Sequence, residues 1–225
     1  IQEPRHDYEG LLKGNVWLHN LPEGSTFADA ARIMDKYNGW EDCPASIGAF
    51  IRRADPEKET IKYEQFQKTR FRVFGIMPDE EHFLPAARRE AEKLGYRTAV
   101  LTQLLQAEAS QCAKVLSAIA INVAEFGEPF APPLALFSSG EMLVTVDKAD
   151  GVGRRNQEFA LACALQIAGN ERIVIGSVDS DGTDGPGGLA LPSAPDCLGG
   201  GLVDGFTAGQ AKEMGIDIYQ ALADH

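Results

Sequence analysis

Apolar side chains recur at helical spacing in two short stretches of the N-terminal part of the chain. The apolar positions within 27–34 follow a Ser-Thr pair that can serve as an N-cap, and they predict a helix. A second helix is predicted over 45–53. The next stretch, 54–67, is polar, and we interpret it as a linker at a domain boundary. We expect residues 1–67 to be an N-terminal domain segment with its linker.

Beyond this stretch, short apolar runs alternate with helical patterns. Strands are predicted at 71–75, 96–101, 134–137, 143–146 and 173–178, and helices at 79–94, 107–126, 155–168, 207–214 and 218–223. The run at 143–146 is expected to be the hairpin partner or a neighbour of the strand before it. Such alternation indicates an α/β fold with a mostly parallel sheet flanked by helices. The predicted α/β domain covers 68–225.

Composition and charge exclude several classes of protein. Hydrophobic residues make up 44% of the chain and charged residues 24%, as in ordinary globular proteins. The 33 acidic residues outnumber the 21 basic ones, which gives a net charge of −12 and argues against a nucleic-acid partner. No apolar run reaches the roughly 20 residues that span a bilayer, so no membrane partner is expected. Four widely spaced cysteines without a CxxC pair disfavour a cysteine metal site, and a cytoplasmic location is expected.

Glycine is concentrated in one third of the chain. Of the 23 glycines, 13 fall within residues 140–205. Glycine packed this densely indicates that the backbone approaches a ligand closely. Several of these glycines lie in three polar segments, each of which follows a predicted strand. Because ligands of open α/β sheets bind at the carboxyl ends of strands, all three segments are candidate site segments.

The first segment runs from Ser138 to Glu141. Its two hydroxyls and its glycine could bind an oxyanion through backbone N–H groups and side-chain donors. The alternative is a tight turn between two strands.

The second segment, 151–158, opens a predicted helix. Gly151 and Gly153 would let backbone N–H groups face an anion at the positive end of the helix dipole. Arg155 adds a fork of donors for phosphate or carboxylate. The alternative is a solvated arginine pair on a loop. The segment lacks the third glycine of a dinucleotide fingerprint, so an NAD site is not supported.

The third segment carries Asp179, Asp181 and Asp184 among glycines and hydroxyls. Carboxylates grouped in this way could hold a hard divalent cation. One of them could instead accept a proton from a substrate hydroxyl. A surface turn rich in Asp and Gly is the alternative.

Together, these segments resemble the class II glycerate kinases, whose C-terminal part carries the MOFRL domain and some of which are called hydroxypyruvate reductases. The matching stretches are 138–141, 153–158, 180–186 and 202–207. They follow the family's Ser-Gly-Gly-Glu, Gly-Gly-Arg-Asn-Gln-Glu, Thr-Asp-Gly-x-Asp-Gly-Pro and Val-Asp-Gly-Thr patterns in order and spacing. Ser139 and Arg154 stand where the family has glycine. The family's first domain contributes a lysine to its active site, and the chain resembles a middle and C-terminal portion, truncated before the final Gly-rich segment.

The resemblance implies phosphorylation of glycerate by ATP with Mg²⁺, and it assigns roles to residues of the three segments. The candidate catalytic residues are Arg155, Asp181 and Asp184, and the two aspartates are also the candidate ligands of Mg²⁺. The candidate substrate-binding residues are Ser138, Glu141, Asn156, Glu158 and Ser180, and the candidate ATP-binding residues are Gly151, Gly153 and Gly182.

Two other functions and one question of assembly stay open at this point. The chain could be a small-anion-binding module without catalysis of its own. It could also be a hydroxypyruvate reductase, against which the missing dinucleotide fingerprint argues. A homodimer is one assembly that the sequence leaves open.

Overall fold

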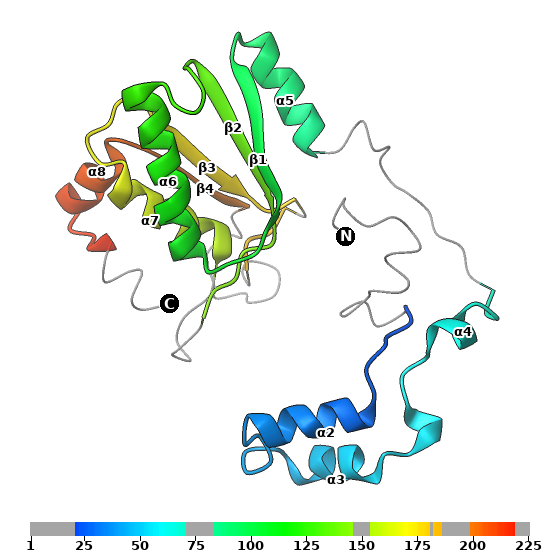
Figure 1. The fold of residues 1–225 in the computed structure, drawn as a ribbon. Coiled ribbons are helices and arrows are strands. Elements are labelled where there is room, and N and C mark those ends of the chain that lie inside the picture. The colour runs from blue at the N-terminus through cyan, green and yellow to red at the C-terminus, as the bar shows by residue number, and fades with distance from the viewer. Residues whose placement is uncertain (1–20, 71–82, 146–153, 181, 186–198, 219–225) are drawn as a thin grey trace. The chain divides into compact units, whose positions relative to one another are not determined.

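The computed structural model describes residues 21–70, 83–145, 154–180, 182–185 and 199–218 (Figure 1). Contacts between residues divide the chain into two compact units, Gln2–Ile76 and Met77–His225.

The first unit is built around a pair of helices, α2 (Phe27–Lys36) and α3 (Ala45–Arg53). Thr26 caps α2, and its side chain accepts a hydrogen bond from the N–H of Asp29 while the Asp29 carboxylate accepts one from the N–H of Thr26. This reciprocal capping box satisfies two N–H groups that the helix itself leaves without partners. Both helices predicted for this region are confirmed.

The stretch expected to be a linker carries two short helices, η1 (Pro56–Lys58) and α4 (Tyr63–Phe66). It folds back against the start of α2. The carboxylate of Glu59 accepts a hydrogen bond from the N–H of Phe27 at 3.0 Å, and the Lys62 ammonium binds the carbonyl of Ser25. Long-range hydrogen bonds, which the polar composition did not reveal, hold this stretch in place.

The second unit contains two pairs of strands (Figure 1). β1 (Arg97–Leu105) and β2 (Leu134–Gly140) are parallel, and the helix α6 (Ala109–Phe126) connects them. β3 (Val174–Val178) and β4 (Gly200–Asp204) are antiparallel.

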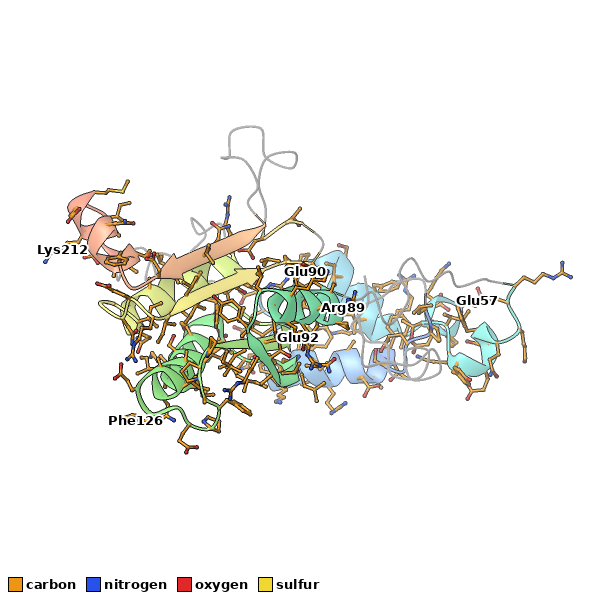
Figure 2. All side chains as sticks on the ribbon, turned by 90° about the horizontal axis from the view of Figure 1, so that it is seen from above. Glu57, Arg89, Glu90, Glu92, Phe126 and Lys212 are labelled. Atoms are coloured by element: carbon orange, nitrogen blue, oxygen red, sulfur yellow. The ribbon has the colours of Figure 1, made fainter. Side chains whose placement is uncertain are left out.

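Three further helices belong to this unit: α5 (Phe83–Lys93), α7 (Arg155–Gln166) and α8 (Thr207–Glu213). α5 packs against β1 and β2, and its charged side chains Arg89, Glu90 and Glu92 are exposed (Figure 2). Glu92 also accepts a hydrogen bond from the hydroxyl of Thr98 on β1 at 2.7 Å. Neither α6, which has 18 residues, nor any other helix that the structure describes is long and apolar enough to cross a membrane.

The core of this unit lies between α6 and α7 and extends from α7 to the antiparallel strands. The side chains buried in this core are small: Ala113, Cys163 and Ala164 are completely buried. Their small size allows α6 and α7 to approach each other closely. β4 also comes very near α7. A Cβ atom added at Gly201 would lie 2.8 Å from the Cβ of Ala160, so this position accommodates only glycine without a shift.

The α/β class is confirmed, and the differences from the predicted elements have local causes. Within the described residues, one strand pair is parallel and the other antiparallel, because β4, which the sequence pattern did not predict, pairs with β3. Of the strand predicted at 143–146, residues 143–145 are described, and they form a single bridge, between Leu143 and Glu108. The strand predicted at 71–75 and nearly all of the helix predicted at 218–223 lie outside the described residues.

Candidate functional site

The predicted site residues gather where β2 and β3 end and α7 begins. Ser138 and Glu141 belong to the end of β2, and Arg155, Asn156 and Glu158 form the first turn of α7. Ser180, Gly182 and Asp184 follow β3. Three predicted residues, Gly151, Gly153 and Asp181, lie outside the described residues.

Arg155 connects the two strand ends. Its Nη1 donates hydrogen bonds to the carboxylate of Glu141 and, at 3.3 Å, to the carbonyl of Met142. Its Nη2 lies 3.8 Å from Oδ2 of Asp179, the residue that follows β3. The side chain is 34% exposed, so solvent or a ligand can still reach the guanidinium.

The surroundings of Arg155 keep it positively charged. The hydrogen bond to Glu141 raises the pKa of Arg155 above its ordinary value, and the charges of Glu141, Asp179 and Asp184 act in the same direction against the opposing effect of burial. Arg155 is therefore a fixed cation among carboxylates, in a chain whose net charge is −12.

The position of Glu141 depends on a glycine at the end of β2. Gly140 has a φ of +143°, and a Cβ atom there would lie 2.3 Å from the carbonyl oxygen of Leu105. The next residue, Glu141, donates its N–H to that same carbonyl at 2.8 Å. A side chain at position 140 would separate the strands and displace the carboxylate that binds Arg155.

Asp184 binds the N-terminus of α7. Its Oδ1 accepts hydrogen bonds from the backbone N–H (3.0 Å) and the side-chain Nδ2 (3.1 Å) of Asn156, and its Oδ2 accepts one from the N–H of Gln157 (2.8 Å). Asp184 is 0% exposed. The sequence predicted that backbone N–H groups at the start of this helix face a bound anion. In the structure, two of these groups instead donate to a carboxylate of the chain itself.

Asn156 extends this buried network to β3. Its Oδ1 accepts a hydrogen bond from the hydroxyl of Ser177, while its Nδ2 faces Asp184. Because a carboxylate only accepts hydrogen bonds, this arrangement fixes the orientation of the Asn156 amide. The first turn of α7 is therefore attached both to β3 and to the loop that follows it.

The remaining predicted residues lie on the same elements with looser connections. Ser138 is half-buried on β2 opposite Thr102, and Ser180 is exposed after β3. Neither serine makes a hydrogen bond to Arg155 in the part of the chain that the structure describes. Gly182, with a φ of +86°, closes a turn by donating its N–H to the carbonyl of Asp179 at 3.2 Å.

Two residues of the site were not selected from the sequence. Asp179 faces Arg155, and its position as the first carboxylate after a predicted strand was the available signal. Glu108 accepts hydrogen bonds from the hydroxyl of Thr145 at 2.7 Å and from the N–H of Thr145 at 3.2 Å. This contact ties the start of α6 to the segment after β2.

The described residues contain no cluster of three or more His, Cys, Asp or Glu side chains that could hold a metal ion. The carboxylates around Arg155 already have partners within the chain. Glu141 and Asp179 face Arg155, and Asp184 accepts three hydrogen bonds from N–H groups of α7. The expected metal role of Asp181 concerns a residue outside the described part.

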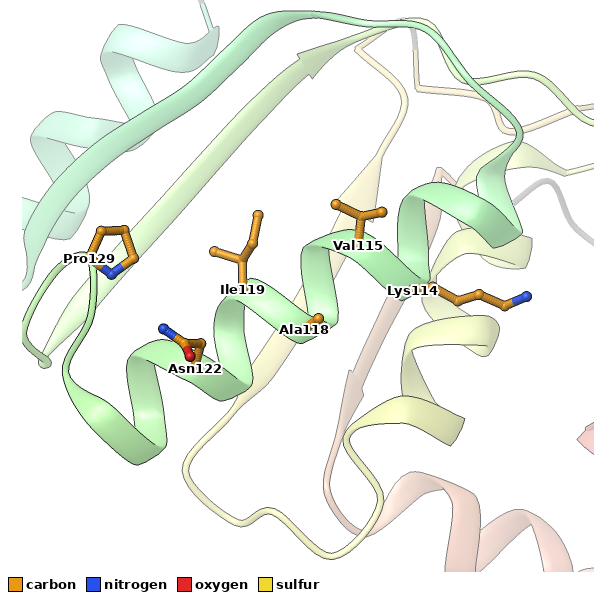
Figure 3. A pocket seen from close by; sticks show the side chains of 6 residues that line it. All are labelled: Lys114, Val115, Ala118, Ile119, Asn122 and Pro129. Carbon is orange, nitrogen blue, oxygen red and sulfur yellow. The ribbon is translucent and has the colours of Figure 1, made fainter.

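An open hollow of about 490 Å³ lies elsewhere on this unit, along α6 (Figure 3). It is lined by Lys114, Val115, Ala118, Ile119, Asn122 and Pro129. The lining is mostly apolar and includes none of the predicted site residues. The predicted site residues therefore lie outside this hollow.

Comparison with known proteins gives a consistent result. Residues 134–225 match the model of the MOFRL family. The chain is 34% identical over 215 residues to a protein from Pyrococcus horikoshii named glycerate 2-kinase, a match that covers 91% of this chain and 44% of that protein. It is 29% identical over 206 residues to a putative hydroxypyruvate reductase from Agrobacterium vitis, covering 91% of this chain and 43% of that protein.

A solved structure shares the fold. The crystal structure of glycerate kinase from Thermotoga maritima superimposes with a TM-score of 0.59 at 32% identity, and the match covers 91% of this chain and 44% of that one. The chain thus spans less than half the length of the relatives that it matches.

Proposed function

Residues 134–225 belong to the MOFRL family, and on this basis we propose that the chain takes part in phosphorylation of glycerate by ATP, as a glycerate 2-kinase does. Its distant homology to proteins named glycerate 2-kinase, at 30–34% identity, supports this proposal.

The observation that carries the proposal is the placement of Arg155. Its guanidinium is charged, one third exposed and held where two strands end, between Glu141 and Asp179. Glycerate carries a carboxylate, and phosphoryl transfer spreads negative charge over the transferred oxygens. A fixed guanidinium stabilises either kind of anion, and such electrostatic stabilisation is the main contribution of a protein to phosphoryl transfer.

The guanidinium keeps donor capacity for a ligand. Nη1 is occupied by Glu141 and the carbonyl of Met142, whereas Nη2 makes the longer 3.8 Å ion pair with Asp179. The Nη2 side of Arg155 is therefore the side at which we expect the anion to bind. In the transfer itself, the 2-hydroxyl oxygen of glycerate bonds to the γ-phosphorus, the bond to the ADP oxygen breaks, and a carboxylate takes the hydroxyl proton.

The other predicted residues complete the proposed site. Ser138, Asn156, Glu158 and Ser180 would form its wall together with Glu141. Gly151, Gly153 and Gly182 are proposed to lie near ATP, and Asp181 is proposed to bind Mg²⁺ or to accept the proton. The use of Mg²⁺, a cytoplasmic location and a homodimer stay predictions.

Two assays on the natural polypeptide that carries this sequence test the proposal. The first supplies ATP and D-glycerate and couples ADP formation to NADH oxidation, and the second supplies hydroxypyruvate and NADH. We expect turnover in the first and none in the second. Turnover only in the second would favour a reductase, and turnover in neither would favour an anion-binding module, so both outcomes contradict the proposal.

A further inference from the structure

Helix N-termini commonly bind the anionic groups of ligands, but the N-terminus of α7 is already occupied. The first N–H groups of a helix have no partner within the helix and attract negative charge. In α7, the N–H groups of Asn156 and Gln157 both donate to Asp184. The Asp184 carboxylate is fully buried, so an external phosphate cannot reach these two donors while it is in place.

The same hydrogen bonds fix the residue next to them. Arg155 directly precedes Asn156, whose backbone and side chain are both held by Asp184. Ser177 holds the other end of the Asn156 amide from β3. The backbone from which the Arg155 side chain extends is thus anchored from two directions, while its guanidinium reaches Glu141.

We propose that Asp184 is a positioning residue, which closes the N-terminus of α7 to ligand anions and fixes Arg155 as the group that binds them. This inference rests on the proposed function. It gives Asp184 a different role from the metal-binding or catalytic role that the sequence suggested, because all three of its hydrogen bonds hold α7 in place.

Kinetics of Asp184→Asn in the natural polypeptide test this role. We expect kcat/KM for D-glycerate to fall at least tenfold, while the Mg²⁺ concentration for half-maximal activity changes less than twofold. In an Arg155→Lys background, the same Asp184→Asn change should cost less than a further twofold, because Asp184 acts through Arg155. The matched control is Asp204→Asn, which changes a carboxylate that accepts hydrogen bonds from the N–H groups of Phe206 and Thr207 at the start of α8. This control should stay within twofold of the parent.

Two kinetic results would overturn the proposal. A tenfold rise in the Mg²⁺ requirement, with activity restored at high Mg²⁺, would identify Asp184 as a metal ligand. An unchanged kcat/KM would show that Asp184 does not position Arg155.

A binding experiment on the parent protein needs neither a variant nor kinase activity. Inorganic phosphate is titrated while NMR follows the Arg155 Nε–H and the backbone amides of Asn156 and Gln157. We expect the Arg155 resonance to shift and the two amides to stay within their line widths. Shifts concentrated at the two amides would contradict the proposal. Because this readout is independent of turnover, a failure of the proposed function stays distinguishable from a failure of this inference.

Discussion

Replacing Asp184 with asparagine should destabilise the unit that contains α7. The substitution removes a buried charge and one of two acceptor oxygens at nearly constant volume. If the asparagine oxygen takes the place of Oδ1, both hydrogen bonds from Asn156 are kept, but the new NH₂ group then faces the N–H of Gln157. At least one buried N–H group therefore loses its partner.

The expected loss follows from these bonds. A hydrogen bond to a charged group contributes about 1.5–3 kcal/mol, and a buried donor without a partner costs about 1–3 kcal/mol. Asp184→Asn should thus lower the free energy of unfolding by about 2–4 kcal/mol. Asp184→Ala removes all three bonds and should lower it by about 4–5 kcal/mol.

Native-state amide hydrogen exchange measured over residues 155–166 is the suitable assay. Peptides from α7 should exchange faster in Asp184→Asn by the factor that corresponds to the lost stability. Ser180→Ala, an exposed change in the same loop, serves as the control and should stay within about 0.5 kcal/mol of the parent. Protection of α7 unchanged in Asp184→Asn would refute the role of this carboxylate as a helix cap.

Three further predictions follow from other parts of the structure. In urea denaturation, Gly201→Ala should lower the free energy of unfolding by about 1–3 kcal/mol, because the added methyl group meets α7. Gly209→Ala lies in α8 with open space around the added methyl group and should raise the free energy of unfolding by about 0.5–1 kcal/mol. Equal effects of the two changes would contradict this packing. Burial raises the pKa of Cys163 to about 11, so the thiol of the folded protein should resist alkylation at pH 8. The unit that contains Cys163 should also lose stability as the pH rises from 9 toward 11. Rapid alkylation of Cys163 in the folded protein would contradict this prediction. Hydrogen bonds, of which the one from Arg32 has the largest effect, lower the pKa of Asp29 to about 2. The contribution of this carboxylate to the stability of α2 should therefore persist above pH 4 and disappear as the pH falls through 2. An NMR titration that gave the Asp29 carboxyl group a pKa near 4 would contradict this prediction.

Helices that carry their own boundary signals were predictable from the sequence. The capping residues before α2 and the regular apolar positions of α6 are local features, and both helices have the expected type and nearly the expected bounds. β4 was missed because two of its five residues, Gly200 and Gly201, are typical of turns. The pairing of β4 with β3 and its close contact with α7 require these glycines. Both are tertiary contacts, which the local sequence pattern does not show.

The convergence of candidate residues was predictable, but the individual contacts among them were not. Residues after strands and at helix starts are expected to converge in an α/β fold, and Glu141 and Arg155 do. Asp184 lies 28 residues from Asn156, so spacing alone could not show that its carboxylate caps α7. Asp179 directly follows a predicted strand, but no local feature showed that its carboxylate would face Arg155.

The most direct test of the proposed function is the turnover of D-glycerate and ATP by Arg155→Ala in the natural polypeptide, measured beside the parent and Arg155→Lys. Removing a donor that stabilises transition-state charge typically lowers the rate by about 10²–10³-fold. We expect a loss of that size in kcat/KM for Arg155→Ala and a smaller loss for Arg155→Lys, which keeps the charge but not the fork of donors. Parent-level turnover by Arg155→Ala would contradict the assignment of Arg155 as the anion-binding centre of a glycerate kinase site.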